Sequence, residues 1–233
     1  MILDRVTITG ADDRTDPAEL ARLSERYPFA EWGILISEAK AGKPRFPAAE
    51  WRQRLAEIAG RAPGGLRLAA HLVGSLARKA MLEGSDEFFT GPYQAGIYQR
   101  IQLNGFSSLA KAARCPVIKR YPSHVFILQV QSDEAYGLAA RYGASRASNV
   151  AVLFDKSGGK GEMPGRWPEP KFDLYTGFAG GIGPDKVDTV CEAIKAYPFG
   201  PYWIDMEGNV RTDDVLDLLK VERVLEQGQR WIR

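Results

Sequence analysis

The sequence predicts a (β/α)8 barrel, in which eight parallel strands, each followed by a helix, close into one sheet. Short apolar or β-branched runs recur roughly 30 residues apart, about the length of one strand–helix–strand unit. Helix-like amphipathic segments separate these runs, and such alternation favours a parallel sheet. The first run is followed by Gly10-Ala11-Asp12-Asp13 and not by the Gly-x-Gly-x-x-Gly of a Rossmann sheet. The eight runs therefore favour the closed barrel over an open sheet.

The expected strands follow the apolar runs. Residues 1–233 show no linker or shift in composition, so we expect them to form one barrel domain. The fifth strand has a competitor in Pro116–Lys119, and the longer β-branched run Val125–Val130 is preferred. In chain order, the expected strands are Val6–Thr9, Trp32–Ile36, Leu68–Val73, Tyr98–Leu103, Val125–Val130, Val150–Phe154, Tyr175–Phe178 and Tyr202–Ile204.

Helix signals lie between several of these strands. Asp16-Pro17-Ala18-Glu19 combines an N-cap aspartate with proline at the first helical position and glutamate at the third. Glu50–Ala59 and Pro184–Ala196 have similar patterns. Asp133–Tyr142 is a further helix, although Gly137 lowers its helix propensity.

The composition excludes several classes of protein. Lys and Arg number 31 against 29 for Asp and Glu, and this small excess of positive charge does not suggest a nucleic-acid partner. The two cysteines, Cys115 and Cys191, are far apart and have no metal-like spacing. The chain has no long apolar segment and its first residues do not resemble a signal peptide. We therefore expect a cytoplasmic protein with no membrane partner.

Polar residues follow nearly every expected strand. In a barrel of this kind the site is built at the carboxyl ends of the strands, so these residues predict one shared site. Strand ends also meet solvent, which is the simpler explanation of any single polar residue. The ring consists of Thr9, Ser37, His71, Gln102, Asn104, Gln129, Gln131, Asp155 and Asp205.

The segment from Phe178 to Asp185 is the most distinctive local pattern. A strand ends in Gly180 and Gly181, and a helix is expected to open at Pro184. Glycine allows an oxyanion to approach the backbone closely, and a helix N-terminus presents free N–H groups to it. The pattern predicts a phosphate site, with a tight turn that needs glycine only for its dihedral angles as the alternative.

Five charged or titratable residues near strand ends are candidates for chemistry. Asp155 suits a general acid, or else a helix cap or ion-pair partner. Arg45 suits a clamp for a carboxylate or phosphate, or else a solvated surface charge. His71 lies inside a strand, where a histidine is more often a core residue than a base. Alternation places Asp205 and Glu207 on the same side of the last strand.

Taken in order, these residues resemble phosphoribosylanthranilate isomerase, the barrel enzyme of the tryptophan pathway. The resemblance spans most of the chain. The similar segments, each with the family's pattern, are Val6-Thr7-Ile8-Thr9-Gly10 (Val-Lys-Ile-Cys-Gly), Lys43-Pro44-Arg45-Phe46 (Ser-Pro-Arg-Tyr), Ile101-Gln102-Leu103-Asn104-Gly105 (Val-Gln-Leu-His-Gly), Leu153-Phe154-Asp155 with Gly158-Gly159-Lys160-Gly161 (Leu-Leu-Asp, then Gly-Gly-x-Gly), Ala179-Gly180-Gly181-Ile182-Gly183-Pro184-Asp185-Lys186-Val187 (Ala-Gly-Gly-Leu-x-Pro-Glu-Asn-Val) and Ile204-Asp205-Met206 (Val-Asp-Val).

The resemblance implies a barrel of the phosphate-binding type and an Amadori rearrangement of an aminoribose phosphate. It implies Asp155 as the general acid and Arg45 as the clamp on the anthranilate carboxylate. It places the phosphate at Gly180 and Gly181, with help from Gly208 in the loop after the last strand. No metal or organic cofactor is implied, and the partner is a small molecule, expected to be phosphorylated. The chain is expected to be a monomer or a homodimer.

Three positions depart from the family's pattern. The family's base is the cysteine of the first strand, where this chain has Thr9, whose hydroxyl is far too weakly acidic to replace a thiolate unaided. The family's histidine in the substrate-binding Gln102 motif is Asn104 here. The Ser-Ser-Gly phosphate turn is replaced by Glu207-Gly208-Asn209, and the carboxylate of Glu207 repels a phosphate.

Three functions are consistent with these residues. The first is an isomerase of a phosphosugar or related carbonyl compound, in which Asp155 works with Asp205, Glu207 or His71 as a substitute base. The second is a barrel lyase or aldolase with Lys119 as the Schiff-base amine, which requires Pro116–Lys119 to be the fifth strand. The third is a ligand-binding relative without catalysis.

Overall fold

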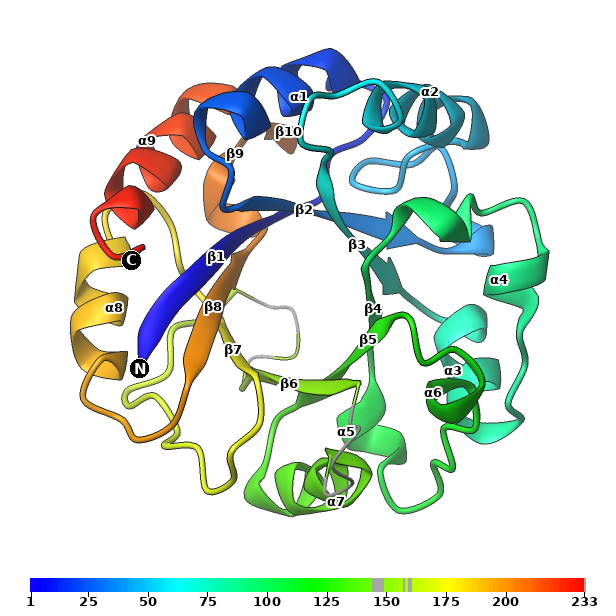
Figure 1. Ribbon diagram of the computed structural model, residues 1–233, viewed down its shortest axis with the longest axis vertical. Coiled ribbons are helices and arrows are strands. Elements are labelled where there is room, and N and C mark those ends of the chain that lie inside the picture. The colour runs from blue at the N-terminus through cyan, green and yellow to red at the C-terminus, as the bar shows by residue number, and fades with distance from the viewer. Residues whose placement is uncertain (144–148, 157, 159–160, 233) are drawn as a thin grey trace.

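The protein folds as a closed barrel of eight parallel strands surrounded by helices (Figure 1). The computed structural model describes residues 1–143, 149–156, 158 and 161–232. Each strand pairs with the next, and the last pairs with the first. The predicted fold class is therefore confirmed. The strands are β1 (Ile2–Thr9), β2 (Ala30–Ile36), β3 (Arg67–Leu72), β4 (Arg100–Leu103), β5 (Val125–Val130), β6 (Val150–Asp155), β7 (Thr176–Ala179) and β8 (Pro201–Met206).

Helices form the outer ring, and both chain ends lie on the same side of it, beside α8 and α9 (Figure 1). A short hairpin of β9 (Arg211–Thr212) and β10 (Val215–Leu216) follows β8. The helices are α1 (Pro17–Arg26), α2 (Ala49–Ala59), α3 (Ser75–Leu82), α4 (Glu87–Thr90), α5 (Phe106–Leu109), α6 (Val117–Arg120), α7 (Asp133–Gly143), α8 (Val187–Ile194) and α9 (Leu218–Gln229), with 3-10 turns η1 (Glu38–Lys40), η2 (Ala95–Ile97) and η3 (Gly208–Val210).

Local signals explain where the first and last helices begin. The side chain of Asp16 accepts a hydrogen bond from the backbone N–H of Ala18 at 3.1 Å, and Pro17 takes the first helical position of α1. Asp217 caps α9 in the same way by accepting from the N–H groups of Leu219 and Lys220. These bonds satisfy amide groups that would otherwise lack a partner at the helix ends.

The structure confirms Val125–Val130 as the fifth strand and corrects the start of one helix. Residues 117–120 form α6 on the outside of the barrel, with Pro116 at its N-cap, because Val125–Val130 occupies the fifth position of the sheet. Lys119 is consequently exposed on α6 and cannot serve as a Schiff-base amine in the barrel mouth. Helix α8 begins at Val187 and not at Pro184, since residues 184–186 form a turn before it.

The main apolar core lies between the barrel and the helices, and the barrel interior has a different character. Its middle is filled by a small apolar cluster formed by Ile127, Ala151, Leu153 and Trp203. Below this cluster, toward the amino ends of the strands, lies a buried ionic group centred on Glu31. The interior is therefore partly apolar and partly ionic.

Glu31 is fully buried and has three polar partners from strands β1 and β4. Its carboxylate accepts hydrogen bonds from Thr7 at 2.8 Å and from the guanidinium groups of Arg5 and Arg100 at 3.0 Å each. Burial acts to raise the pKa of Glu31, but Arg100, Arg5 and Thr7 outweigh it and hold that pKa below its usual value. The Arg100 guanidinium also lies over the Trp203 ring, 3.9 Å from its centre. The charges are thus paired within the barrel and capped by an aromatic ring.

Among the helices of the described part of the chain, none is both long and apolar enough to cross a bilayer.

Two glycines with different surroundings provide a test of this packing. A Cβ atom at Gly177 would lie 2.1 Å from Cε2 of Trp203, whereas a Cβ atom at Gly137 in α7 would meet no atom within 4 Å. We predict that Gly177→Ala lowers the free energy of unfolding by about 1–3 kcal/mol through overpacking. Gly137→Ala, the matched control, should raise it by about 0.5–1 kcal/mol. Urea unfolding measures both, and an unchanged stability of Gly177→Ala would contradict the packing of Trp203 described above.

Candidate functional site

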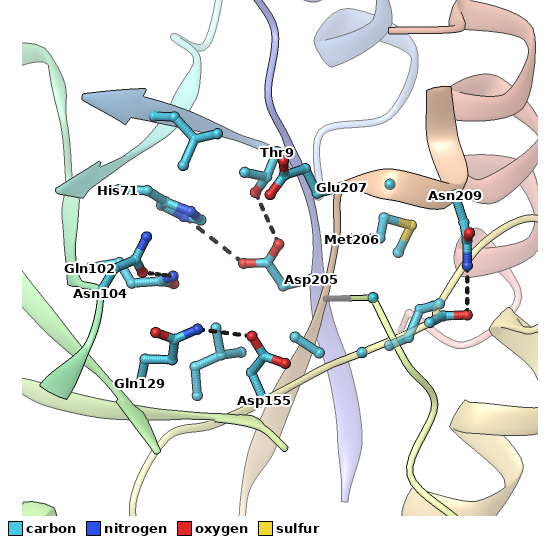
Figure 2. Close-up of a pocket in the computed structure, with 18 of the residues that line it drawn as sticks. Thr9, His71, Gln102, Asn104, Gln129, Asp155, Asp205, Met206, Glu207 and Asn209 are labelled. Atoms are coloured by element: carbon cyan, nitrogen blue, oxygen red, sulfur yellow. Dashed lines mark hydrogen bonds and ion pairs between the residues drawn. The ribbon is translucent and has the colours of Figure 1, made fainter. Parts of the chain in front are cut away.

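A cavity of about 210 Å³ opens at the carboxyl ends of the strands, and most of the residues that the sequence analysis singled out for the site line it (Figure 2). Their chemical roles stay predictions, but the structure does bring them together. These residues are Thr9, Arg45, His71, Gln102, Asn104, Asp155, Gly180, Gly181, Asp205, Glu207 and Gly208.

The register of the strands places Asp155 and Asp205 on either side of Ala179. Asp155 of β6 pairs with Ala179 of β7, and Ala179 pairs with Asp205 of β8. The two aspartates therefore lie in one layer, about 10 Å apart at their backbones given the usual spacing of neighbouring strands. Both side chains point into the cavity (Figure 2). A small molecule between them would meet a carboxyl group on each side.

A buried polar group lies across the cavity from Asp155. It consists of Thr9, His71 and Asp205. The Thr9 hydroxyl donates to Oδ1 of Asp205 at 2.9 Å, and Nε2 of His71 lies 3.9 Å from Oδ2 of the same residue (Figure 2). Gly33, which pairs with Thr9, leaves the space that they occupy. A Cβ atom there would lie 2.3 Å from Thr9 Oγ1 and 2.8 Å from His71 Cε1.

Burial sets the protonation of this group. The pKa of Asp205 is raised well above its usual value, chiefly by burial, against the Thr9 hydrogen bond and with the added repulsion of Glu31. The pKa of His71 is lowered to about 4, again chiefly by burial. Near neutral pH the structure therefore favours an uncharged imidazole beside a carboxyl group that retains its proton to unusually high pH.

Amide side chains form the third part of the wall. Gln129 donates from Nε2 to Oδ2 of Asp155 at 2.8 Å, and its Oε1 accepts from the backbone N–H of Gly105 at 3.0 Å. Gln102 donates to Asn104 at 2.6 Å. Among the described residues, no group hydrogen-bonds to Oε1 of Gln102 or Nε2 of His71, although both atoms are buried.

Arg45 occupies the rim of the cavity, and its charge is already paired. It donates to Glu207 and to Asp214, each at 2.7 Å, and so connects the loop after β2 to the hairpin after β8. Its backbone adopts a left-handed conformation with φ of 72°, which is uncommon for a residue with a side chain. The predicted anion clamp is therefore bound to two carboxylates of the chain itself.

The Gly180–Gly181 turn packs against the chain's own loop. A Cβ atom at Gly180 would lie 2.7 Å from the carbonyl oxygen of Glu162, and one at Gly181 would lie 2.6 Å from the backbone nitrogen of Met163. Both glycines have positive φ values, 119° and 65°. Asn209 donates to the carbonyl oxygen of Gly181 at 2.9 Å. Glycine is required here by the close approach of protein backbone and by the turn itself.

Some residues expected at the site lie outside the cavity, and some residues that shape the cavity were not expected. Ser37 and Gln131 were expected in the ring but do not line the cavity. Gly33 and Asp214 were missed, because each acts through a partner that is distant in the sequence. Of the glycine-rich loop expected to lie near Asp155, positions 157, 159 and 160 lie outside the described residues. Within the described residues, no cluster of three or more His, Cys, Asp or Glu side chains is arranged to hold a metal ion.

Comparison with known proteins supports the fold. No family model and no curated protein matches the chain. Among solved structures, it is similar to dimeric phosphoribosylanthranilate isomerase from Thermotoga maritima, with 15% identity, a TM-score of 0.59 and coverage of 98% of this chain and 99% of that one. It is also similar to N-(5'-phosphoribosyl)anthranilate isomerase from Pyrococcus furiosus (14%, TM-score 0.58, coverage 97% and 98%) and to TrpF from Jonesia denitrificans (14%, 0.55, 97% and 96%). The resemblance found in the sequence is confirmed, and at this identity it is a likeness of fold.

The raised pKa of Asp205 predicts a specific dependence of stability on pH. Between about pH 4 and the pKa in the folded protein, the folded state binds a proton that the unfolded state has lost, so stability falls as pH rises. An asparagine side chain cannot ionise, so Asp205→Asn removes this fall in stability with rising pH. Relative to wild type, the variant should gain about 1.4 kcal/mol of unfolding free energy per pH unit between about pH 4 and the pKa of Asp205 in the folded protein, and the difference should be constant outside this window.

The measurement is urea unfolding at a series of pH values. The contribution of His71, whose pKa is lowered to about 4, has the opposite sign but is present in both proteins and cancels in the difference. Asp173→Asn, at an exposed carboxylate, is the control and should differ from wild type by less than about 0.5 kcal/mol throughout. A constant difference between wild type and Asp205→Asn would contradict the raised pKa.

Proposed function

We propose that the protein is an acid–base isomerase of a small carbonyl compound, such as a sugar or sugar derivative, bound in the barrel mouth. The observation that carries this proposal is the pair of carboxyl groups on β6 and β8, which face each other across the cavity in different surroundings. Such pairs divide the roles of acid and base between two chemically identical groups.

In the proposed reaction Asp205 is the acid and Asp155 is the base. Asp155 removes the proton from the carbon next to the carbonyl group, while Asp205 gives its proton to the carbonyl oxygen. The product of this step is an enediol, and the reverse transfers at the neighbouring carbon complete the isomerisation. The resemblance implied Asp155 as the acid. The buried, proton-retaining carboxyl of Asp205 supports the opposite assignment.

Thr9 and His71 support Asp205 in this scheme. Thr9 holds Oδ1 of Asp205 by its hydrogen bond, which leaves Oδ2 directed toward His71 and the cavity. His71 is uncharged above about pH 4, so it does not draw the proton from Asp205 by forming an ion pair. Its unpartnered Nε2 is placed to bind a substrate hydroxyl. Thr9 is a positioning residue here, and the scheme needs no thiolate on the first strand.

The proposal predicts proton exchange with solvent at the carbon beside the carbonyl group. A panel of aldoses, ketoses, their phosphates and phosphoribosylanthranilate is incubated with the protein in D2O, and loss of that proton signal is followed by NMR. At least one member should exchange, and Asp155→Asn and Asp205→Asn should each slow it by about 10²–10⁴-fold. Phosphoribosylanthranilate should give little or no product, because Thr9 stands where that family has its cysteine base.

Asp133→Asn is the control, because this carboxylate is exposed on α7 and lies outside the cavity. It should exchange at the wild-type rate. Binding without exchange across the whole panel would identify a ligand-binding protein. Exchange that survives Asp155→Asn would reject the assigned base, and cleavage of a carbon–carbon bond would identify a lyase.

A further inference from the structure

We infer that the buried ion pair of Glu31 and Arg100 controls the mouth of the barrel electrostatically, because its two charges act in opposite directions on the proton of Asp205. Neither residue lines the cavity, so both are positioning residues that act through Asp205. The role of Asp205 as the acid rests on the proposed function. The coupling between the ion pair and Asp205 can be measured without any turnover.

The register of the strands brings the ion pair close to the acid. Asp205 of β8 pairs with Thr7 of β1, and Thr7 pairs with Glu31 of β2. Neighbouring strands lie about 4.8 Å apart, so the backbones of Glu31 and Asp205 are about 10 Å apart. The Thr7 hydroxyl donates to Glu31 at 2.8 Å, and the Thr9 hydroxyl donates to Asp205 at 2.9 Å. Both carboxyl groups therefore contact the inner face of β1, at positions two residues apart.

Arg100 reaches the same region from β4. Its guanidinium donates to Glu31 at 3.0 Å and lies 3.9 Å from the centre of the Trp203 ring. Trp203 precedes Asp205 by two residues on β8, so the two side chains lie on the same face of that strand. Within the described part of the chain, Nε and Nη2 of Arg100 are buried without a hydrogen-bond partner, and Glu31 is the carboxylate with which Arg100 forms an ion pair.

The surroundings of these groups allow their charges to act over this distance. The small apolar cluster in the middle of the barrel separates the ion pair from the mouth, and Glu31, Arg100 and Asp205 are all buried. Water and salt screen buried charges much less than exposed ones. At about 10 Å and an effective dielectric constant of about 20, one unit charge shifts a pKa by roughly one unit.

The two charges of the pair have opposite effects, and they act on two groups of the mouth. Glu31 acts to raise the pKa of Asp205, whereas Arg100 acts to lower it. The pKa of His71 responds in the same sense, upward to Glu31 and downward to Arg100. Burial instead moves the two pKa values apart, upward for Asp205 and downward for His71. The effects of charge and of burial can therefore be distinguished by following both groups.

Other titratable or charged groups also face Asp205 and His71. Glu207 follows on the strand of Asp205 and adds to the raised pKa. Asp155 of β6 and Arg45 of the loop after β2 line the same cavity. All three residues are unchanged in the variants compared below, so differences between these variants report on the ion pair.

The experiment measures both pKa values by NMR in wild type, Glu31→Gln, Arg100→Met and the double variant. The carboxyl carbon of Asp205 and the ring of His71 are followed against pH at constant ionic strength. Glu31→Gln should lower both pKa values by roughly one unit, and Arg100→Met should raise both by roughly half a unit to one unit. The double variant loses two opposed contributions, so both values should lie within about half a unit of wild type.

Arg100→Met is the decisive variant, because Glu31 keeps Arg5 and Thr7 as partners and its charge stays paired. Methionine also replaces the buried stem of the arginine by an apolar chain. If Glu31→Gln does not fold, the double variant supplies the same information, since its pKa values should lie roughly one unit below those of Arg100→Met. In that variant Arg5 retains its ion pair with Asp4.

Two controls accompany these variants. Thr7→Val removes a hydrogen bond to Glu31 but no charge, so it should shift both pKa values by less than about 0.3 unit. His124 is the other histidine of the chain, and its ring contacts Phe89 and Tyr121 outside the barrel interior. Its pKa should be the same in all variants.

Loosened packing would give a different result from a change in charge. Water that entered the interior would move each pKa toward its ordinary value, so that of Asp205 would fall while that of His71 would rise. A fall in the pKa of Asp205 in Arg100→Met, or no change in it, would overturn the inference. An equally large response to Thr7→Val would do the same.

A second readout connects the coupling to the proposed reaction. An acid must carry its proton, so the loss of exchange activity at high pH should move with the pKa of Asp205, upward in Arg100→Met and downward in Glu31→Gln. Shifted pKa values in a protein that exchanges no proton would refute the proposed function alone. Unshifted values in a protein that does exchange would refute this inference alone.

Discussion

The buried carboxylate of Glu31 is the interaction on which the interior of the barrel depends. It unites three strands, because Thr7 and Arg5 belong to β1, Glu31 to β2 and Arg100 to β4. Replacement of Glu31 by a neutral residue would leave the buried guanidinium of Arg100 without its carboxylate partner, which typically costs about 3–5 kcal/mol. The same carboxylate reaches the functional end of the barrel through its field, since it adds to the raised pKa of Asp205.

Closure of the sheet determines the geometry above this ionic group. Thr9 and Asp205 are separated by 196 positions in the chain and meet only because β8 pairs with β1. The absence of a side chain at Gly33 then allows Thr9 and His71 to approach each other above β2. The polar group in the mouth thus follows from one strand pairing and one missing Cβ atom. Its unusual protonation follows from the burial that both impose.

The glycine turn after β7 has a sequence pattern that permits two different kinds of contact. Two glycines with positive φ can admit an anion to the backbone, or they can admit another segment of protein. In this chain the loop after β6 and the segment after β8 both pack on the turn. Glu207 pairs with Arg45 on the rim of the same mouth.

The sequence by itself determined the barrel and most of the residues that line its mouth. Runs of β-branched residues at regular intervals marked all eight strands, and the rule that sites form at carboxyl strand ends selected side chains that do share one cavity. Those signals are local, or follow from the fold class. Only the tertiary structure decided that residues 117–120 form a helix, because a short apolar run has no distinct periodicity and the sheet had one place for a fifth strand. It alone decided that Arg45 is paired, that His71 faces inward and that Asp205 favours its proton, since charge pairing and burial depend on residues from distant strands.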